Sequence, residues 1–186
     1  MGRVSQAQAE ENRRRVVDTA SRLFREQGTQ VSVADLMKAA GMTHGAFYKQ
    51  FASKEALVDE ATAHAFTELA RHHSAGLERH DGQREAAQQA LIDTYLSVEH
   101  RDDPADGCPV AALATDIARD GEGREARRVY TEGVADFTHF LTTDDQDGIV
   151  RLCTLFGALV LSRATKGSPL SGEILAAAHA ALTEAD

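Results

Sequence analysis

Between residues 43 and 54 the sequence concentrates side chains whose chemistry suits a polyanion. Thr43 and His44 offer hydrogen-bonding groups, and Tyr48 and Lys49 follow closely. Hydroxyl and ammonium groups are the ones that proteins use to contact phosphate oxygens. Gly45 carries no side chain, so the backbone beside these residues can approach a partner closely. This spacing predicts binding of nucleic acid rather than bond-breaking chemistry.

Two short helical patterns on either side of Gly41 must position these side chains. Ser32 is a good N-cap for the first, with Asp35 three residues later as in a capping box, and Thr43 is placed to cap the second. Helices this short are not stable alone, so the amphipathic segment 12–27 is predicted to pack against them. A second helix held at an angle by a glycine turn is the arrangement that reads the DNA major groove.

Each of these residues also has a purely structural interpretation. Ser32 and Thr43 would be explained as caps alone, and Tyr48 as half-buried packing. Lys49 and Lys54 would be explained as solvated surface charges. A helix-turn-helix pattern alone therefore leaves both interpretations open.

The longer stretch is more specific. Residues 39–57 read AAGMTHGAFYKQFASKEAL. This stretch closely resembles the DNA-binding domain of the TetR family, whose pattern is A-x-x-A-G-V-[ST]-x-G-x-[FL]-Y-x-[HY]-F-x-[SN]-K-E-x-L. Met42 replaces the usual valine, and Gln50 replaces the usual histidine or tyrosine. The resemblance covers about residues 10–57, and beyond them it holds only as helix number and layout.

The resemblance implies a role for each position of the pattern. Phe47 would be buried, the tip of the second helix would face bases, and Ala46 would touch a thymine methyl group. The hydroxyl and lysine side chains would contact phosphates. The implied DNA-binding set is Ser32, Thr43, His44, Gly45, Ala46, Tyr48, Lys49 and Lys54.

Charge is distributed unevenly along the chain. The net charge is −9, yet residues 1–55 hold nine Lys/Arg against six Asp/Glu, and the remainder holds eleven against 23. A basic N-terminal region on an acidic remainder restricts DNA contact to that region. The polar N-terminus predicts no signal peptide, and no apolar run is long enough for a membrane span. Two distant cysteines predict a reducing, cytoplasmic location.

The rest of the chain shows helical signals only. Gly28 is expected to end the first helix, and further helices are expected over about 54–78, 84–101, 109–120, 124–142, 149–166 and 170–184. The prediction is an all-α chain of about nine helices. Residues 1–53 would form the three-helix DNA-binding domain, and residues 54–186 a helical ligand-binding and dimerisation domain.

The resemblance also implies partners. TetR-like proteins are usually homodimers built through their last two helices, here about residues 149–184, that bind a palindromic operator on double-stranded DNA. Their middle helices usually enclose a small-molecule effector, so a repressor released by an apolar or electrophilic inducer is expected. A co-ligand-dependent repressor or an activator remains the alternative. The candidate pocket residues are Phe66, Leu69, Tyr95, Cys108, Leu113, Ile117, Tyr130, Phe137 and Leu155.

The two cysteines and the histidines are the remaining residues with possible chemistry. Cys108 would be the N-cap of a helix beginning at Pro109, where a thiol can have a lowered pKa and sense electrophiles or oxidants. Cys153 lies in an apolar run and is expected to be packing. The histidines show no i,i+4 pairing and no supporting Asp or Cys spacing, so no metal site and no cofactor are predicted. No nucleophile–base motif or phosphate loop appears, so no enzyme is expected.

Overall fold

The computed structural model describes residues 6–121 and 124–183, and every regular element among them is a helix. Nine are α-helices and one is a 3₁₀-helix, so the all-α prediction is confirmed. Along the chain they are α1 (Gln6–Gln27), α2 (Val33–Ala39), η1 (His44–Lys49), α3 (Lys54–Arg79), α4 (Arg84–Tyr95), α5 (Val98–Asp102), α6 (Pro109–Arg119), α7 (Glu125–Leu141), α8 (Gly148–Ala164) and α9 (Pro169–Thr183).

We call α1, α2, η1 and the first two turns of α3 the head. Its core consists of side chains that the helical spacing places on inward faces, chiefly Val16, Phe24, Leu36, Phe47 and Leu57. Burying these apolar surfaces is what stabilises helices too short to persist alone.

Glycines end two of the head helices, as the sequence predicts. Gly28 has a φ of +83° and Gly41 a φ of +69°, in the left-handed region that glycine adopts without strain. The Met42 N–H donates back to the Met37 carbonyl at 2.8 Å, which closes α2. This turn sets the angle between α2 and η1.

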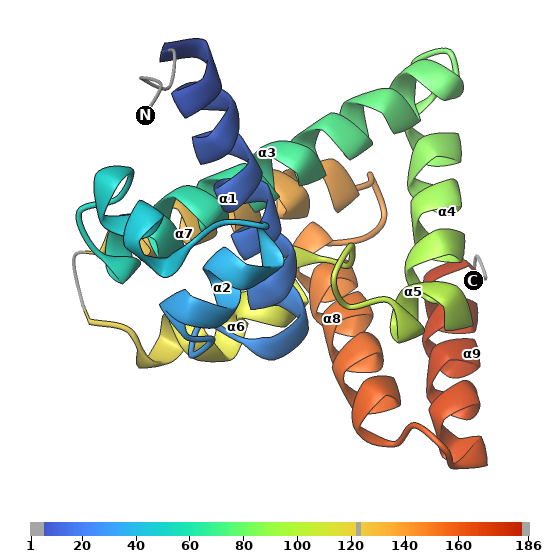
Figure 1. The fold of residues 1–186 in the computed structure, drawn as a ribbon. Coiled ribbons are helices and arrows are strands. Elements are labelled where there is room, and N and C mark those ends of the chain that lie inside the picture. Colours follow the sequence, from blue (N-terminus) through green and yellow to red (C-terminus); the bar gives the residue numbers. More distant parts are fainter. Residues whose placement is uncertain (1–5, 122–123, 184–186) are drawn as a thin grey trace.

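The long helix α3 connects the head to the remaining helices, which we call the body (Figure 1). Ser53 begins it, because its hydroxyl accepts a hydrogen bond from the Ala56 N–H at 3.2 Å. The N-terminal half of α3 contributes Leu57 and Ala61 to the head core, and Phe66 belongs to the separate core of the body. One rigid element therefore crosses both cores.

The body departs from the sequence prediction at one point. The expected helix over 84–101 is two helices, because α4 ends at Tyr95 with Leu96 as its C-cap, and Ser97 caps α5 by accepting from the His100 N–H at 3.1 Å. Leu96, the residue that ends α4, is buried. Helices α8 and α9 pack along each other at one end of the body (Figure 1). Within the described residues no helix has the length and apolarity needed to cross a membrane.

Candidate functional site

The 3₁₀-helix η1 separates its side chains into a buried and an exposed face. Phe47 is fully buried in the head core, whereas Tyr48 beside it is 65 % exposed. Thr43, His44 and Lys49 are also exposed. The edge of the His44 ring meets the Tyr48 ring at a centroid distance of 5.8 Å. A row of polar and aromatic groups thus projects from one short helix that Phe47 anchors.

The far end of η1 is fixed by α1. The Arg13 guanidinium lies 4.4 Å above the centre of the Phe51 ring and donates hydrogen bonds to the Gln50 carbonyl and the Glu60 carboxylate. Phe51 in turn stacks on Phe47 at a centroid distance of 5.4 Å. Arg13 therefore positions η1 against α1 and α3.

The two predicted caps behave differently. Ser32 caps α2, since its hydroxyl accepts from the Asp35 N–H at 3.1 Å and donates to the Asp35 carboxylate at 2.6 Å. Thr43 begins η1 with extended backbone, but its side chain makes no capping hydrogen bond. The Thr43 hydroxyl is therefore available to a partner, whereas that of Ser32 is engaged.

Three residues in and just after η1 suit contact with a phosphate backbone. Lys49 and Lys54 have no ion-pair partner within the described ranges. Lys49 is exposed, and Lys54 is half-buried at the start of α3. A β-carbon built on Gly45 would meet nothing within 4 Å, and Ala46 beside it is half-buried. The free protein thus tolerates a side chain at Gly45, so any steric requirement there comes from a partner.

A cavity of about 540 Å³ lies in the body between α3, α4, α7 and the loop before α6. Leu69, Tyr95, Cys108 and Phe137 of the expected pocket line it. Other predicted residues lie elsewhere. Leu113 and Ile117 belong to the head core, and Leu155 is fully buried. Phe66 and Tyr130 pack edge to face, and the Tyr130 hydroxyl donates to the Val110 carbonyl at 2.8 Å.

The cavity wall also contains residues that the sequence reasoning missed. These are Arg25, Glu68, His72, His73, Arg79, His80, His100 and Phe140, among others. Several lie one helical turn apart on α3, so a helical-spacing search around Leu69 would have found them. Together they make the wall more polar than the predicted aromatic set.

Two buried polar groups in this wall lack hydrogen-bond partners. The Tyr95 hydroxyl and the His73 Nε2 atom are buried, and neither meets hydrogen-bond geometry within the described part of the chain, although the Cys108 thiol lies beside Tyr95. Burial, and then the neighbouring thiol, raise the pKa of Tyr95 well above its usual value. Burial lowers the pKa of His73 to about 4, so this imidazole is neutral near pH 7. A ligand that hydrogen-bonds to either group would remove a desolvation cost.

Burial argues against an activated thiol at Cys108, which the sequence left as an alternative. Cys108 is the N-cap of α6 with Pro109 in its first turn, as predicted. However, the side chain is buried, and burial raises the pKa of the Cys108 thiol despite the nearness of Tyr95 and of the Val110 and Ala111 backbone, which lower it less. Desolvation of the thiolate thus outweighs the helix N-terminus.

The expectation that Cys153 is packing is wrong. Cys153 is exposed on α8. The same surface of α8 and the start of α9 exposes large apolar side chains, namely Ile149, Val150, Val160, Leu161 and Leu170. Contiguous apolar side chains on a surface mark an interaction site. The apolar run of α8 is therefore only partly covered within one chain.

Comparison with known proteins agrees with the geometry. Residues 16–61 match the model of the bacterial regulatory proteins, tetR family. Over 61 residues the chain is 41 % identical to the HTH-type transcriptional regulator AcrR of Shigella flexneri, a match spanning 32 % of this chain and 28 % of that protein. The chain thus aligns with less than a third of that relative's length.

The whole chain also resembles solved structures. The reduced form of NemR from E. coli superposes with a TM-score of 0.77 at 18 % identity, covering 93 % of this chain and 95 % of that one. A TetR transcriptional regulator from Chloroflexus aurantiacus superposes with a TM-score of 0.75 at 22 % identity, covering 95 % and 94 %. These likenesses extend the shared fold over the body. The chain thus matches the model of the bacterial regulatory proteins, tetR family, over residues 16–61, and it shares the fold of these solved structures over nearly its whole length.

Proposed function

We propose that the protein is a cytoplasmic transcription regulator that binds a palindromic DNA operator through η1. The observation that carries this proposal is the division of η1 into buried Phe47 and an exposed face of Thr43, His44, Tyr48 and Lys49. The exposed groups match those that contact bases and phosphates in helix-turn-helix complexes. Ala46 and Lys54 extend this surface, and Ser32 adds the capped start of α2.

The binding unit is a homodimer joined through α8 and α9. The exposed Ile149, Val150 and Leu161 side chains support this pairing, because burying such a surface is the main driving force of association. A C2 dimer presents two copies of η1 to the two halves of a palindrome.

The dimer proposal is tested by sedimentation of two variants. Leu161→Asp places a charge on the proposed interface and is expected to give monomers. Val98→Asp is the matched control, since Val98 is similarly exposed (49 % against 55 %) but lies on α5. If Leu161→Asp remains dimeric, the interface lies elsewhere.

The effector is a small, largely apolar molecule with an aromatic ring and a few polar groups. A cavity of about 540 Å³ suits a small organic ligand. His73 stacks on Phe140 at a centroid distance of 4.5 Å, which extends an aromatic wall for such a ring. The Tyr95 hydroxyl would supply the specific hydrogen bond to the effector. Tyr95→Phe is therefore expected to lower the affinity for the effector while leaving the affinity for the operator unchanged.

Helix α3 would couple the two sites. Its first turns pack in the head core, and its later residues Glu68, Leu69 and His73 line the cavity. A ligand that shifts α3 changes the spacing of the two η1 helices and lowers operator affinity, provided that it binds the shifted state better. An inducer would thus release the protein from its operator and allow transcription, which is how a repressor responds.

The alternatives predict different responses. A co-ligand-dependent repressor would bind the operator only with its effector, and an activator would raise transcription when bound. An electrophile sensor acting through Cys108 is disfavoured by the burial that raises its thiol pKa, although Cys108 does line the cavity.

The test is selection of random duplex DNA by the purified, ligand-free protein, followed by sequencing. Enrichment of one palindrome supports the proposal, and it must disappear in a Tyr48→Ala, Lys49→Gln double variant that keeps the wild-type melting temperature. If nothing is enriched even when cell extract supplies co-ligands, η1 is not a DNA-reading element.

A further inference from the structure

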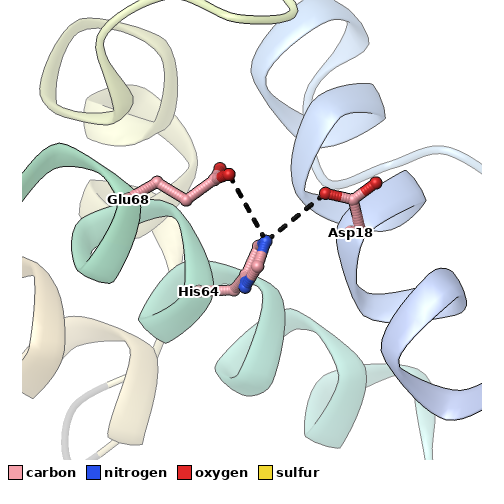
Figure 2. A group of neighbouring side chains, drawn as sticks. All are labelled: Asp18, His64 and Glu68. Carbon is pink, nitrogen blue, oxygen red and sulfur yellow. Dashed lines mark ion pairs between the residues drawn. The ribbon is translucent and has the colours of Figure 1, made fainter. Parts of the chain in front are cut away.

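A cluster of potential metal ligands lies where α1 crosses α3. Asp18 comes from α1, His64 and Glu68 come from α3, and their ligand atoms all lie within 4.8 Å of one another (Figure 2). His64 Nε2 is 3.4 Å from Asp18 Oδ1 and 3.7 Å from Glu68 Oε1. We propose that these three side chains bind one divalent transition-metal ion, such as Zn²⁺.

The separations agree with what such an ion requires. Ligand bonds of about 2.1 Å in a tetrahedral site place neighbouring donor atoms about 3.4 Å apart. Both distances from His64 Nε2 are already close to that value. Only the Asp18 and Glu68 oxygens need to draw together, and Asp18 is exposed enough to rotate, with 53 % of its side chain accessible.

The state of His64 supplies an independent argument. Its Nε2 atom is buried yet has no hydrogen-bond partner, because the approach of Asp18 lacks hydrogen-bond geometry. Buried polar atoms in folded proteins are nearly always paired. A metal ion would accept this nitrogen lone pair, and the exposed Asp18 leaves a path for the ion to enter.

The donor set selects the class of metal. One imidazole and two carboxylates suit Zn²⁺, Mn²⁺, Fe²⁺, Co²⁺ or Ni²⁺, whereas Mg²⁺ and Ca²⁺ prefer oxygen ligands alone. Three protein ligands leave at least one coordination position for water.

Two arginines share the carboxylate of Glu68. Arg25, which is buried, places Nη2 3.4 Å from Glu68 Oε2, so it orients the carboxylate and leaves Oε1 for the metal. Arg71 lies 3.5 Å from Oε1 but is largely exposed, so it can move aside. Arg71 is therefore a competitor that the metal must displace.

The position of this site suggests what it regulates. The ion would join α1 of the head to the part of α3 that lines the cavity. Arg25 also donates to the Gly107 carbonyl at 3.3 Å, next to Cys108. We therefore expect the metal to change operator affinity, a consequence that rests on the proposed function.

The site is tested by titrating untagged protein with Zn²⁺ in a calorimeter and with Co²⁺ by absorption spectroscopy. We expect one saturable site per chain, with Co²⁺ bands of nitrogen and oxygen ligation. His64→Gln and Asp18→Asn should each lower the Zn²⁺ affinity by on the order of 100-fold or more. This is the upper range observed when a residue that only supports a metal ligand is lost. Because either variant alone could disturb the head, both are checked by circular dichroism.

The matched control is His179→Gln. His179 Nε2 lies 2.7 Å from Asp93 Oδ1, a histidine–carboxylate pair that no third ligand joins within the described residues. This variant should bind Zn²⁺ like the wild type. The proposal is overturned if no saturable binding occurs, if His64→Gln binds as tightly as wild type, or if thiolate-to-cobalt bands show that cysteine is the ligand.

Operator binding is measured separately. If Zn²⁺ changes operator affinity in the wild type and not in Asp18→Asn, the regulatory role is supported. If Zn²⁺ binds without changing operator affinity, the regulatory role fails while the metal site stands. If the protein binds no operator at all, the calorimetric result still decides the site.

Discussion

The salt dependence of operator binding gives a quantitative test of the exposed face of η1. Lys49 is exposed and has no ion-pair partner in the part of the chain that the structure describes. Lys49→Gln removes one cation per subunit while keeping a side chain of similar reach. Because no internal contact is lost, the free energy of unfolding should change by less than about 0.5 kcal/mol.

The expected magnitude follows from counterion release. Each phosphate neutralised on B-DNA contributes about 0.9 to the slope of log K against log salt. A dimer has two copies of Lys49, so the variant's slope should be shallower by about 1.8. Between about 50 and 200 mM salt, the ratio of wild-type to variant affinity should therefore fall by about tenfold.

The assay is fluorescence anisotropy with the selected operator at several salt concentrations. Lys166→Gln is the matched control, because Lys166 lies in the body with its Nζ 3.1 Å from Asp102 Oδ1. An unchanged slope for Lys49→Gln, or an equal loss for Lys166→Gln, would refute the assignment of Lys49 to a phosphate.

Four further outcomes are expected. Gly45→Ala should stabilise the free protein by about 0.5–1 kcal/mol, since its β-carbon meets nothing, yet weaken operator binding, as melting and anisotropy would show together. Gly133→Ala should destabilise by about 1–3 kcal/mol in urea titrations, because its β-carbon would lie 2.0 Å from the Phe66 ring, whereas Gly172→Ala, with open space, should not. Burial lowers the pKa of His73 from 6.5 to about 4, so below pH 6.5 the unfolded chain binds a proton that the folded imidazole does not. The free energy of unfolding should therefore fall by up to about 3 kcal/mol between pH 6.5 and pH 4, and His73→Phe should remove this pH dependence. In the monomeric Leu161→Asp variant, where the proposed interface is open, a thiol reagent should modify exposed Cys153 before buried Cys108, and the reverse order by mass spectrometry would revive the sensor hypothesis.

Local patterns were sufficient for much of the fold. The capping residues Ser32 and Ser53 and the turn glycines Gly28 and Gly41 fixed where the head helices begin and end. These signals act within a few residues, so the sequence contains them completely. The burial of Phe47, which the resemblance to the TetR family implied, is also confirmed.

Long-range packing decided the rest. The residues that line the cavity were only partly predictable from the sequence. Leu69 lines the cavity and Leu155 is fully buried, a difference that depends on how α3, α4 and α7 cross. The sequence correctly predicted that Cys108 is the N-cap of a helix. The pKa of its thiol is nevertheless raised, because the side chain is buried. The break between α4 and α5 falls at buried Leu96 and the capping Ser97, within an expected single helix.

The proposed metal site shows the same division. His64 and Glu68 lie four residues apart on one helix, a spacing visible in the sequence although no second histidine marks it. Asp18 lies on another helix, and only the crossing of α1 and α3 brings it within reach. Sequence alone thus determined most of the helices and their ends, since those depend on local spacing, whereas the DNA-facing residues follow from the resemblance to the TetR family and stay a prediction. The tertiary structure decided which distant side chains meet, because burial and side-chain contact are properties of packed helices.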